Sequence, residues 1–126
     1  SGIALALEAT APGLTVRTVE PAGFDDMARS LASGARQANP AATGSICDAI
    51  LTPTPGTLTL PILQRLAGPG LAVTDDQTLE AMALAFTHLR IVLEPGGAVA
   101  LAAALFAEGL PDAVIAVATG GNVDPG

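Results

Sequence analysis

Three short segments of the 126-residue chain combine glycine, hydroxyl and carboxylate groups in patterns that could bind a ligand. The most distinctive is residues 117–124, where an apolar stretch runs into Thr119, Gly120, Gly121 and Asn122. A hydroxyl group both donates and accepts hydrogen bonds, and paired glycines let the backbone approach a flat ligand closely. A plain turn after a strand has a similar composition, so the residues alone leave both interpretations open.

The second segment, residues 91–98, places Glu94 directly before Pro95 and two glycines, where a helix is predicted to begin. Helix N-termini attract anions, so this segment could contribute to a binding site. The alternative is that Glu94 is only the N-cap of the helix.

The third segment, residues 20–26, carries Glu20, Asp25 and Asp26 just after a predicted strand. Oxygen-rich loops of this size suit hard cations such as Mg²⁺ or Ca²⁺. The alternative, which the residues alone favour, is that these acids cap a helix starting near Asp25.

His88 and Cys47 are the other reactive side chains, and neither has a partner nearby in sequence. We therefore interpret His88 as a plain helix residue and expect no nucleophilic chemistry from Cys47.

Helices and strands are predicted to alternate, which favours an α/β fold with a parallel sheet. The helices are expected at residues 2–9, 25–33, 58–67, 74–89 (opened by a capping box) and 98–107, and the strands at residues 14–19, 71–73 and 113–118. Residues 35–56 are predicted to form a long irregular excursion that wraps something. Ligands of parallel sheets bind beyond the carboxyl ends of strands, where the first and third segments lie.

Composition excludes several classes of function. The net charge is −7, and the five basic residues are scattered arginines, so nucleic-acid binding is not expected. No N-terminal signal is visible and no apolar run is long enough to span a membrane, so no membrane partner is expected. The single cysteine cannot form an internal disulfide, which suits the cytoplasm. The chain has three Phe and no Trp or Tyr, although aromatic side chains each bury a large surface in a core. We therefore expect additional polypeptide to complete the hydrophobic core.

Five blocks of the sequence resemble, in the same order, the threonine dehydratase and serine racemase family, which is the β-family (fold type II) of pyridoxal-phosphate enzymes. The blocks are residues 1–4, 19–21, 45–50, 93–98 and 119–124. The resemblance implies a three-layer parallel-sheet α/β fold. It also implies that residues 1–126 form the C-terminal portion of a dehydratase catalytic domain, and hence a fragment.

The resemblance also implies roles for individual residues. Thr119 corresponds to the hydroxyl residue that hydrogen-bonds the pyridine nitrogen of the cofactor, and Glu94 corresponds to a carboxylate near the cofactor ring. Gly120 and Gly121 would shape the edge of the ring. Ala49 stands at a cofactor-binding position where the family often has glycine.

Some relatives of the racemase type also carry a divalent cation. The corresponding ligands here are Glu20, the backbone carbonyl of Phe24 and Asp26, a set that fits Mg²⁺, Mn²⁺ or Ca²⁺.

The family's Schiff-base lysine has no counterpart, because this chain contains no lysine. We therefore expect no catalytic residue in this chain and no activity from it alone. The parent is expected to be a cytoplasmic threonine/serine dehydratase, an ammonia-lyase that converts a hydroxy amino acid into a keto acid and ammonia. The chain is expected to form a homo-oligomer or to pair with the missing half. The alternatives are a serine racemase or hydroxyaspartate dehydratase fragment and, in another class, a small non-catalytic α/β binding domain.

Overall fold

The computed structural model describes residues 1–123, which form helices and two short strands. In chain order the elements are α1 (Gly2–Thr10), β1 (Val19–Pro21), α2 (Asp26–Ser33), the 3₁₀ turn η1 (Asp48–Ile50), α3 (Thr59–Leu66), β2 (Leu71–Val73), α4 (Asp75–Leu84), the π-helical turn η2 (Ala85–Leu89) and α5 (Pro95–Phe106). Across these residues, no helix is both long enough and apolar enough to cross a membrane.

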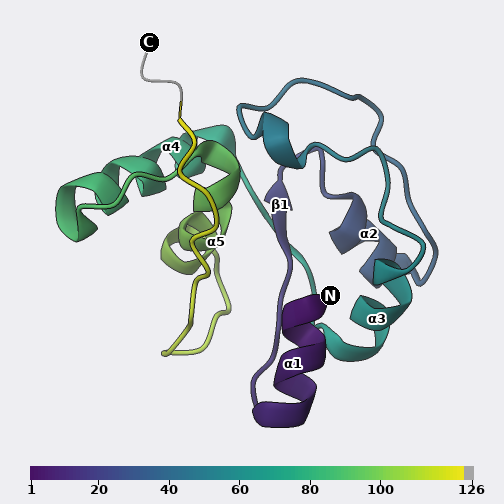
Figure 1. Ribbon diagram of the computed structural model, residues 1–126. Helices are drawn as coiled ribbons and strands as arrows, with labels where there is room; N and C mark the ends of the chain where they lie inside the picture. Colours follow the sequence, from purple (N-terminus) through teal and green to yellow (C-terminus); the bar gives the residue numbers. More distant parts are fainter. Residues whose placement is uncertain (124–126) are drawn as a thin grey trace.

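The sheet consists of β1 and β2, which pair in parallel with Val19 opposite Leu71 and Pro21 opposite Val73. An isolated parallel bridge between Val16 and Ala67 extends the pairing towards the start of the strands. Figure 1 shows α2 and α3 on one side of β1, and α4 and α5 on the other. The expected α/β fold with a parallel sheet between helical layers is therefore confirmed.

Helix α5 packs against α4 and against both strands. Its buried positions carry glycine, alanine and one valine: Gly96, Gly97, Ala98, Val99, Ala102 and Ala103. Such small side chains let neighbouring backbones approach closely, which explains how this core closes with few aromatic rings. Cys47, Val73 and Ala81 pack into the same buried cluster as Val99.

Helix α4 begins with the predicted capping box. The Thr74 hydroxyl accepts a hydrogen bond from Gln77 N, and the Gln77 side chain accepts one from Thr74 N. The helix was expected to continue unchanged to Leu89, but its end widens into the π-helical turn η2. Arg90 then adopts a left-handed conformation with φ of 59° and ends the helical run.

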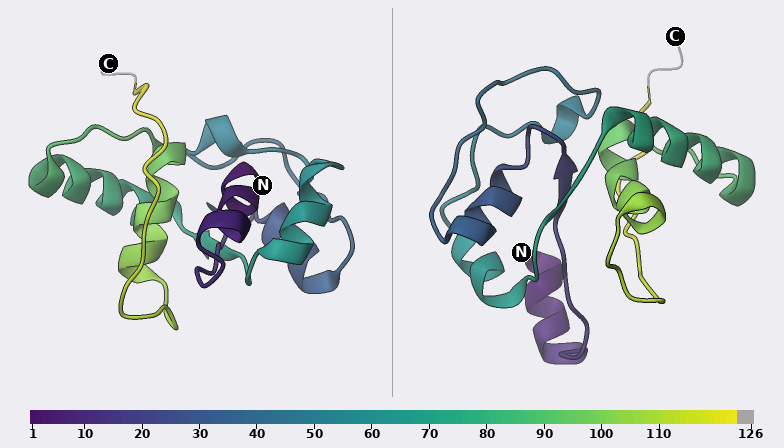
Figure 2. Two further views of the ribbon diagram at one scale, coloured as in Figure 1. Left: turned by 60° about the horizontal axis from the view of Figure 1, so that its bottom comes forward. Right: turned by 180° about the vertical axis from the view of Figure 1, so that it is seen from behind.

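The predicted strand at residues 113–118 is wrong for the described structure. This segment is extended but pairs with neither β1 nor β2, which pair only with each other. It runs alongside α5 instead (Figures 1 and 2), and the Ile115 side chain is 82% exposed. An apolar run of this kind signals a buried strand only where neighbouring strands exist to bury it.

Residues 35–56 form the expected long excursion, which contains η1 (Figure 2). Its two halves bond to each other, since Asn39 N donates to the Pro53 carbonyl at 2.8 Å and Thr54 Oγ1 donates to the Gln37 carbonyl at 2.8 Å. The excursion thus places η1 next to α5.

Candidate cofactor site

The N-terminus of α5 and residues 119–121 lie against each other. Glu94 N donates a hydrogen bond to the Gly120 carbonyl at 3.0 Å, and Thr119 N donates a longer one to the Gly97 carbonyl at 3.5 Å. Two of the three segments singled out from the sequence, residues 91–98 and 117–124, are therefore in contact. We call the meeting point, formed by Glu94, Gly97, Thr119, Gly120 and Gly121, the glycine junction.

Glycine is required at the junction because no side chain has room there. A Cβ atom on Gly97 would lie 2.5 Å from the Gly120 carbonyl oxygen, and one on Gly121 would lie 2.7 Å from the Val92 carbonyl oxygen. A Cβ atom on Gly120 would overlap the Glu94 carboxylate, and Gly120 also has a φ of +156°, which favours glycine. The junction is therefore a close backbone contact that only glycine permits at these three positions.

Ala49 lies on the element that packs beside the glycine junction. It belongs to η1, which packs on α5 through Ile50, whose Cγ2 would be 3.3 Å from a Cβ atom on Gly96. Ala49 is exposed, as are Thr119, Gly120 and Gly121, whereas Glu94 is half-buried. The structure thus brings four predicted cofactor residues into direct contact and places the fifth beside the same helix end.

The position of this helix end gives the site its electrostatics. The first N–H groups of an α-helix carry partial positive charge, which favours electron-rich groups nearby. Glu94 occupies the N-cap position, and its carbonyl accepts hydrogen bonds from Gly97 N at 3.0 Å and Ala98 N at 3.1 Å. The N-cap interpretation and the site interpretation of Glu94 therefore both apply.

Gly97 is a residue of this site that was not predicted from the sequence. The helix was expected at residues 98–107, yet Gly97 lies buried inside the first turn of α5. Two consecutive glycines at a helix start are costly for helix formation, and that cost is the signal that could have identified a close backbone contact.

The predicted cation ligands lie at the start of α2. Glu20 accepts hydrogen bonds from Met27 N at 2.9 Å and Ala28 N at 2.8 Å, one on each carboxylate oxygen. The buried Asp26 accepts one from Asn39 Nδ2 at 2.7 Å through Oδ1. Glu20 therefore caps α2, as the alternative interpretation of this loop expected.

Because the Glu20 carboxylate binds the backbone of α2, the cation site stays a prediction. Within residues 1–123, no three His, Cys, Asp or Glu side chains gather as a metal site. The predicted cation ligands are two carboxylates, of Glu20 and Asp26, and the backbone carbonyl of Phe24, so they would not form a cluster of three such side chains. A carboxylate has about four lone-pair positions, so the two N–H bonds leave Glu20 acceptor capacity for a cation.

Burial raises the pKa of Glu20 from 4.5 to about 7. Loss of hydration is the largest cause, and the negative charges of Asp26 and Asp25 raise the pKa further. The hydrogen bonds from Ala28 N and Met27 N oppose this shift because they favour the ionised form. Glu20 therefore changes its charge close to neutral pH.

Cys47 and His88 take no part in the junction. Cys47 is fully buried in the core, and burial raises the pKa of its thiol, which makes it a poor nucleophile. His88 is exposed on η2, in agreement with its interpretation as a plain helix residue. Asp124, the last residue of the motif that begins at Thr119, lies outside the described residues.

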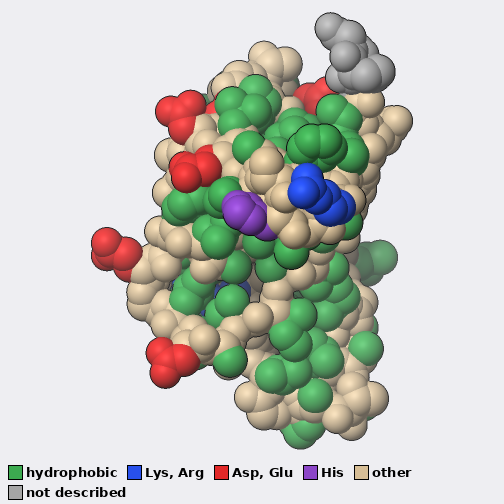
Figure 3. All heavy atoms as spheres, turned by 90° about the vertical axis from the view of Figure 1, so that its left-hand side faces the viewer, with side chains coloured by type: hydrophobic (Ala, Val, Ile, Leu, Met, Phe, Trp, Pro, Cys, Tyr) green, Lys and Arg blue, Asp and Glu red, His purple; other side chains and the backbone are tan. Residues whose placement is uncertain are grey.

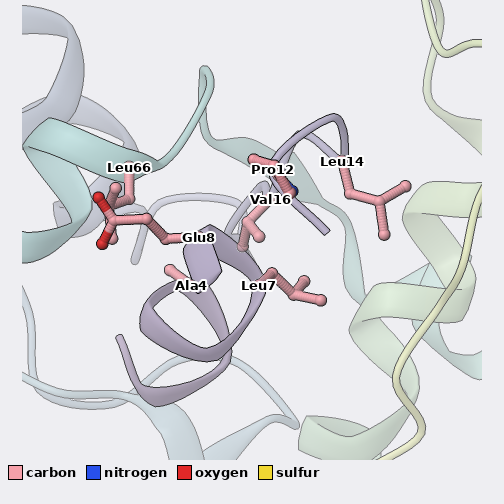
Figure 4. Close-up of a pocket in the computed structure, with 7 residues that line it drawn as sticks. All are labelled: Ala4, Leu7, Glu8, Pro12, Leu14, Val16 and Leu66. Atoms are coloured by element: carbon pink, nitrogen blue, oxygen red, sulfur yellow. The ribbon is translucent and has the colours of Figure 1, made fainter. Parts of the chain in front are cut away.

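A small pocket lies apart from the junction, between α1 and α3 (Figure 4). Its volume is about 110 Å³ and its lining is mostly apolar: Ala4, Leu7, Glu8, Pro12, Leu14, Val16 and Leu66. The only charged lining residue is Glu8, which forms an ion pair with Arg65. The pocket contains none of the predicted site residues and offers no free polar group for catalysis.

The fold and the junction define an α/β domain whose candidate ligand site lies where a glycine-rich turn meets a buried helix end. The family model described as "Pyridoxal-phosphate dependent enzyme" matches residues 1–120, and the chain belongs to this family. Pyridoxal phosphate is the cofactor that the family's description names.

Individual relatives agree with this assignment. The chain is 35% identical to a serine racemase of Oryza sativa subsp. indica, over 100% of this chain and 39% of the relative. It is 36% identical to a beta-hydroxyaspartate dehydratase of Paracoccus denitrificans, over 98% of this chain and 39% of the relative. The crystal structure of the threonine deaminase of T.th. superposes with a TM-score of 0.92 at 37% identity, over 98% of this chain and 45% of that chain. The chain thus spans about two fifths of the length of the curated relatives it matches.

Proposed function

We propose that this chain is the C-terminal portion of the catalytic domain of a pyridoxal-phosphate-dependent dehydratase, which converts threonine or serine into a keto acid and ammonia. The observation that carries the proposal is the glycine junction, where the Glu94 carboxylate and the Thr119–Gly121 turn are in contact. Gly120 and Gly121 are exposed and carry no side chain, so a flat ring could lie against the backbone of this turn. Within the family, the similarity to a threonine deaminase structure, with a TM-score of 0.92, supports dehydratase activity for the complete protein.

Each predicted cofactor residue has a role in the proposal. The Thr119 hydroxyl would hydrogen-bond the pyridine nitrogen of the cofactor, and Glu94 would place a carboxylate beside the ring. The exposed backbone of Gly120 and Gly121 would lie against the ring edge, and Ala49 would lie beside it on η1. When bound, pyridoxal phosphate supplies an electron sink for negative charge at the amino acid's α-carbon. A neutral hydroxyl partner on the ring nitrogen favours β-elimination over full stabilisation of that charge.

The covalent anchor of the cofactor must come from outside this chain. All five basic residues of the chain are arginines, so it holds no amine side chain that could bind the cofactor covalently. We therefore propose that a lysine and a glycine-rich phosphate loop are encoded upstream of Ser1, in the same reading frame.

The genomic sequence upstream of the Ser1 codon tests this proposal directly. We expect a Ser/Thr-x-Lys motif followed by a glycine-rich stretch that leads into Ser1. The purified 126-residue polypeptide with added pyridoxal phosphate is expected to show no dehydratase turnover, whereas the product of the complete reading frame releases keto acid from threonine or serine. A start codon close to Ser1, or turnover by the isolated polypeptide, contradicts the proposal.

Substitution of Thr119 tests its role in the complete protein. Thr119→Val removes the hydroxyl at nearly constant size, and the loss of one hydrogen bond is expected to weaken pyridoxal-phosphate binding about tenfold. Thr119→Ser keeps the hydroxyl and is expected to bind like the wild type. Titration of the cofactor-free protein, followed by the absorbance of the cofactor, measures both constants. Equal affinity in Thr119→Val and Thr119→Ser counts against the assigned hydrogen bond.

Serine racemase is the second candidate, and hydroxyaspartate dehydratase is a close rival. Proteins with these names are 35% and 36% identical to this chain. The acidic loop of Glu20, Phe24 and Asp26 favours the cation-using relatives, and we propose Mg²⁺, Mn²⁺ or Ca²⁺ as its ligand. Chiral analysis of serine after incubation with the complete protein separates the activities, since a racemase accumulates D-serine and a dehydratase accumulates keto acid.

A further inference from the structure

We propose that Asp75 is a positioning residue for the cofactor site: its carboxylate holds residues 45–47, and thereby fixes the η1 turn that carries Ala49 beside the N-terminus of α5. The inference rests on the proposed function, because it assigns Asp75 a role in cofactor binding. Asp75 is the first residue of α4 and belongs to none of the segments that form the junction.

Both oxygens of the Asp75 carboxylate are used across a sequence separation of about thirty residues. Ser45 Oγ donates to Asp75 Oδ1 at 2.6 Å, and Ile46 N donates to Asp75 Oδ2 at 3.1 Å. Ser45 Oγ in turn accepts a hydrogen bond from Cys47 N at 3.1 Å. One carboxylate therefore organises the polar groups of three consecutive residues, which we call the Asp75 clamp.

The buried Cys47 connects the Asp75 clamp to α5, whose N-terminus forms part of the candidate site. The Cys47 side chain is 0% exposed and packs in the core cluster with Val99 of α5. The Cys47 carbonyl accepts a hydrogen bond from Ile50 N at 3.0 Å, which closes η1 around Ala49. Ile50 then lies against Gly96 in the first turn of α5. Each end of η1 is thus fixed, one by the Asp75 clamp and the other by the helix that forms the junction.

The clamp is stronger with a carboxylate than with a neutral amide. Ser45 Oγ and Ile46 N both donate to Asp75, and hydrogen bonds to an ionised acceptor are stronger than neutral ones. An asparagine keeps the bond from Ile46 N through its oxygen but faces the Ser45 hydroxyl with its N–H₂ group, so that hydroxyl must turn to accept and both bonds lose their charge assistance. The α4 N-terminus adds a favourable field for negative charge at this position.

Asp76 provides a matched control for that field. It lies next to Asp75 in the same first turn of α4, and it is exposed. The substitution D76N removes the same charge from the same helix end, so any difference between D75N and D76N reports the clamp and not the helix dipole.

The test uses the product of the complete reading frame, freed of cofactor, as wild type, D75N, S45A, S45T and D76N. Amide hydrogen exchange followed by mass spectrometry measures protection of residues 45–50, and absorbance titration measures the dissociation constant for pyridoxal phosphate. We expect D75N and S45A to lose protection there and to bind pyridoxal phosphate about tenfold more weakly. S45T keeps the hydroxyl, so it and D76N are expected to match the wild type in both measurements.

Three outcomes overturn the inference, and they are distinguishable. If D75N loses protection at residues 45–50 but binds pyridoxal phosphate as tightly as D76N, the clamp is purely structural, while the proposed function stands. If the wild-type protein does not bind pyridoxal phosphate, the proposed function fails and the inference fails with it. Unchanged protection in D75N also overturns the inference. Circular dichroism of every variant checks that the comparisons are made on folded protein.

Discussion

Replacing Gly97 with alanine is expected to lower the free energy of unfolding by about 2 kcal/mol, although alanine is the better helix former. The new Cβ atom would lie 2.5 Å from the Gly120 carbonyl oxygen and 3.1 Å from Gly120 N. These atoms belong to the backbone, which cannot rotate away as a side chain would. The substitution must therefore push residues 119–121 off the end of α5, and urea unfolding measures the cost.

Gly96→Ala is the control for this experiment, since Gly96 precedes Gly97 in the same helical turn. The atoms nearest to its Cβ atom would belong to the side chain of Ile50, with the Cγ2 methyl at 3.3 Å, and that side chain can shift slightly. Because alanine gains up to about 1 kcal/mol of helix propensity over glycine, Gly96→Ala is expected to leave stability unchanged or raised. If both variants lose the same stability, the backbone contact at Gly97 is not the cause.

Stability is expected to fall by about 2 kcal/mol as the pH rises from 4.5 to 7, because of Glu20. Its pKa is about 7 in the folded chain and ordinarily 4.5. Below 4.5 the group is protonated in both states and has no effect. Between these values the unfolded state releases the proton more readily, so rising pH favours unfolding, and above 7 the loss levels off. Urea unfolding of the wild type and Glu20→Gln across this interval measures the difference.

Glu20→Gln is expected to lack this fall, whereas Glu108→Gln, which removes an exposed carboxylate beyond the C-terminus of α5, keeps it. A divalent cation sharpens the test. If Mn²⁺ binds Glu20, Phe24 and Asp26, it prefers the ionised carboxylate, so its stabilising effect is greater above the pKa of Glu20 than below it and disappears in Glu20→Gln. Parallel pH curves for wild type and Glu20→Gln refute the role of Glu20, and Mn²⁺ stabilisation that survives the substitution refutes the cation site.

Features decided by neighbouring residues were predictable from the sequence. The capping box of Thr74 and Gln77 depends only on a four-residue pattern, and it forms as expected. The end of this helix at residue 89 was also predicted, but the widening of the helix at η2 was not. A π-helical turn depends on how the helix end packs rather than on the apolar spacing of its residues.

Contacts between residues far apart in the sequence were predictable only where both residues belong to recognised motifs. The order of blocks indicated that Glu94 and Thr119 belong to one site, and the structure places their segments in contact. The close approach of Gly97 to Gly120 and the hydrogen bonds from Ser45 and Ile46 to Asp75 could not be predicted, because each joins groups that have no local sequence pattern. The prediction of a strand at residues 113–118 was wrong for a related reason. Hydrophobicity indicates that a segment should be buried, but it does not show which strand it would pair with.

The unpaired segment at residues 113–118 also bears on the behaviour of the chain at high concentration. It is a six-residue stretch of alanine, valine and isoleucine with no charge and no proline, and much of it is exposed on the surface. Hydrophobic side chains are also spread over the face that α4 presents (Figure 3). Stretches of this composition are those from which cross-β aggregates nucleate, by stacking of the same segment from many molecules. At high concentration we therefore expect aggregation of the polypeptide to begin at this segment.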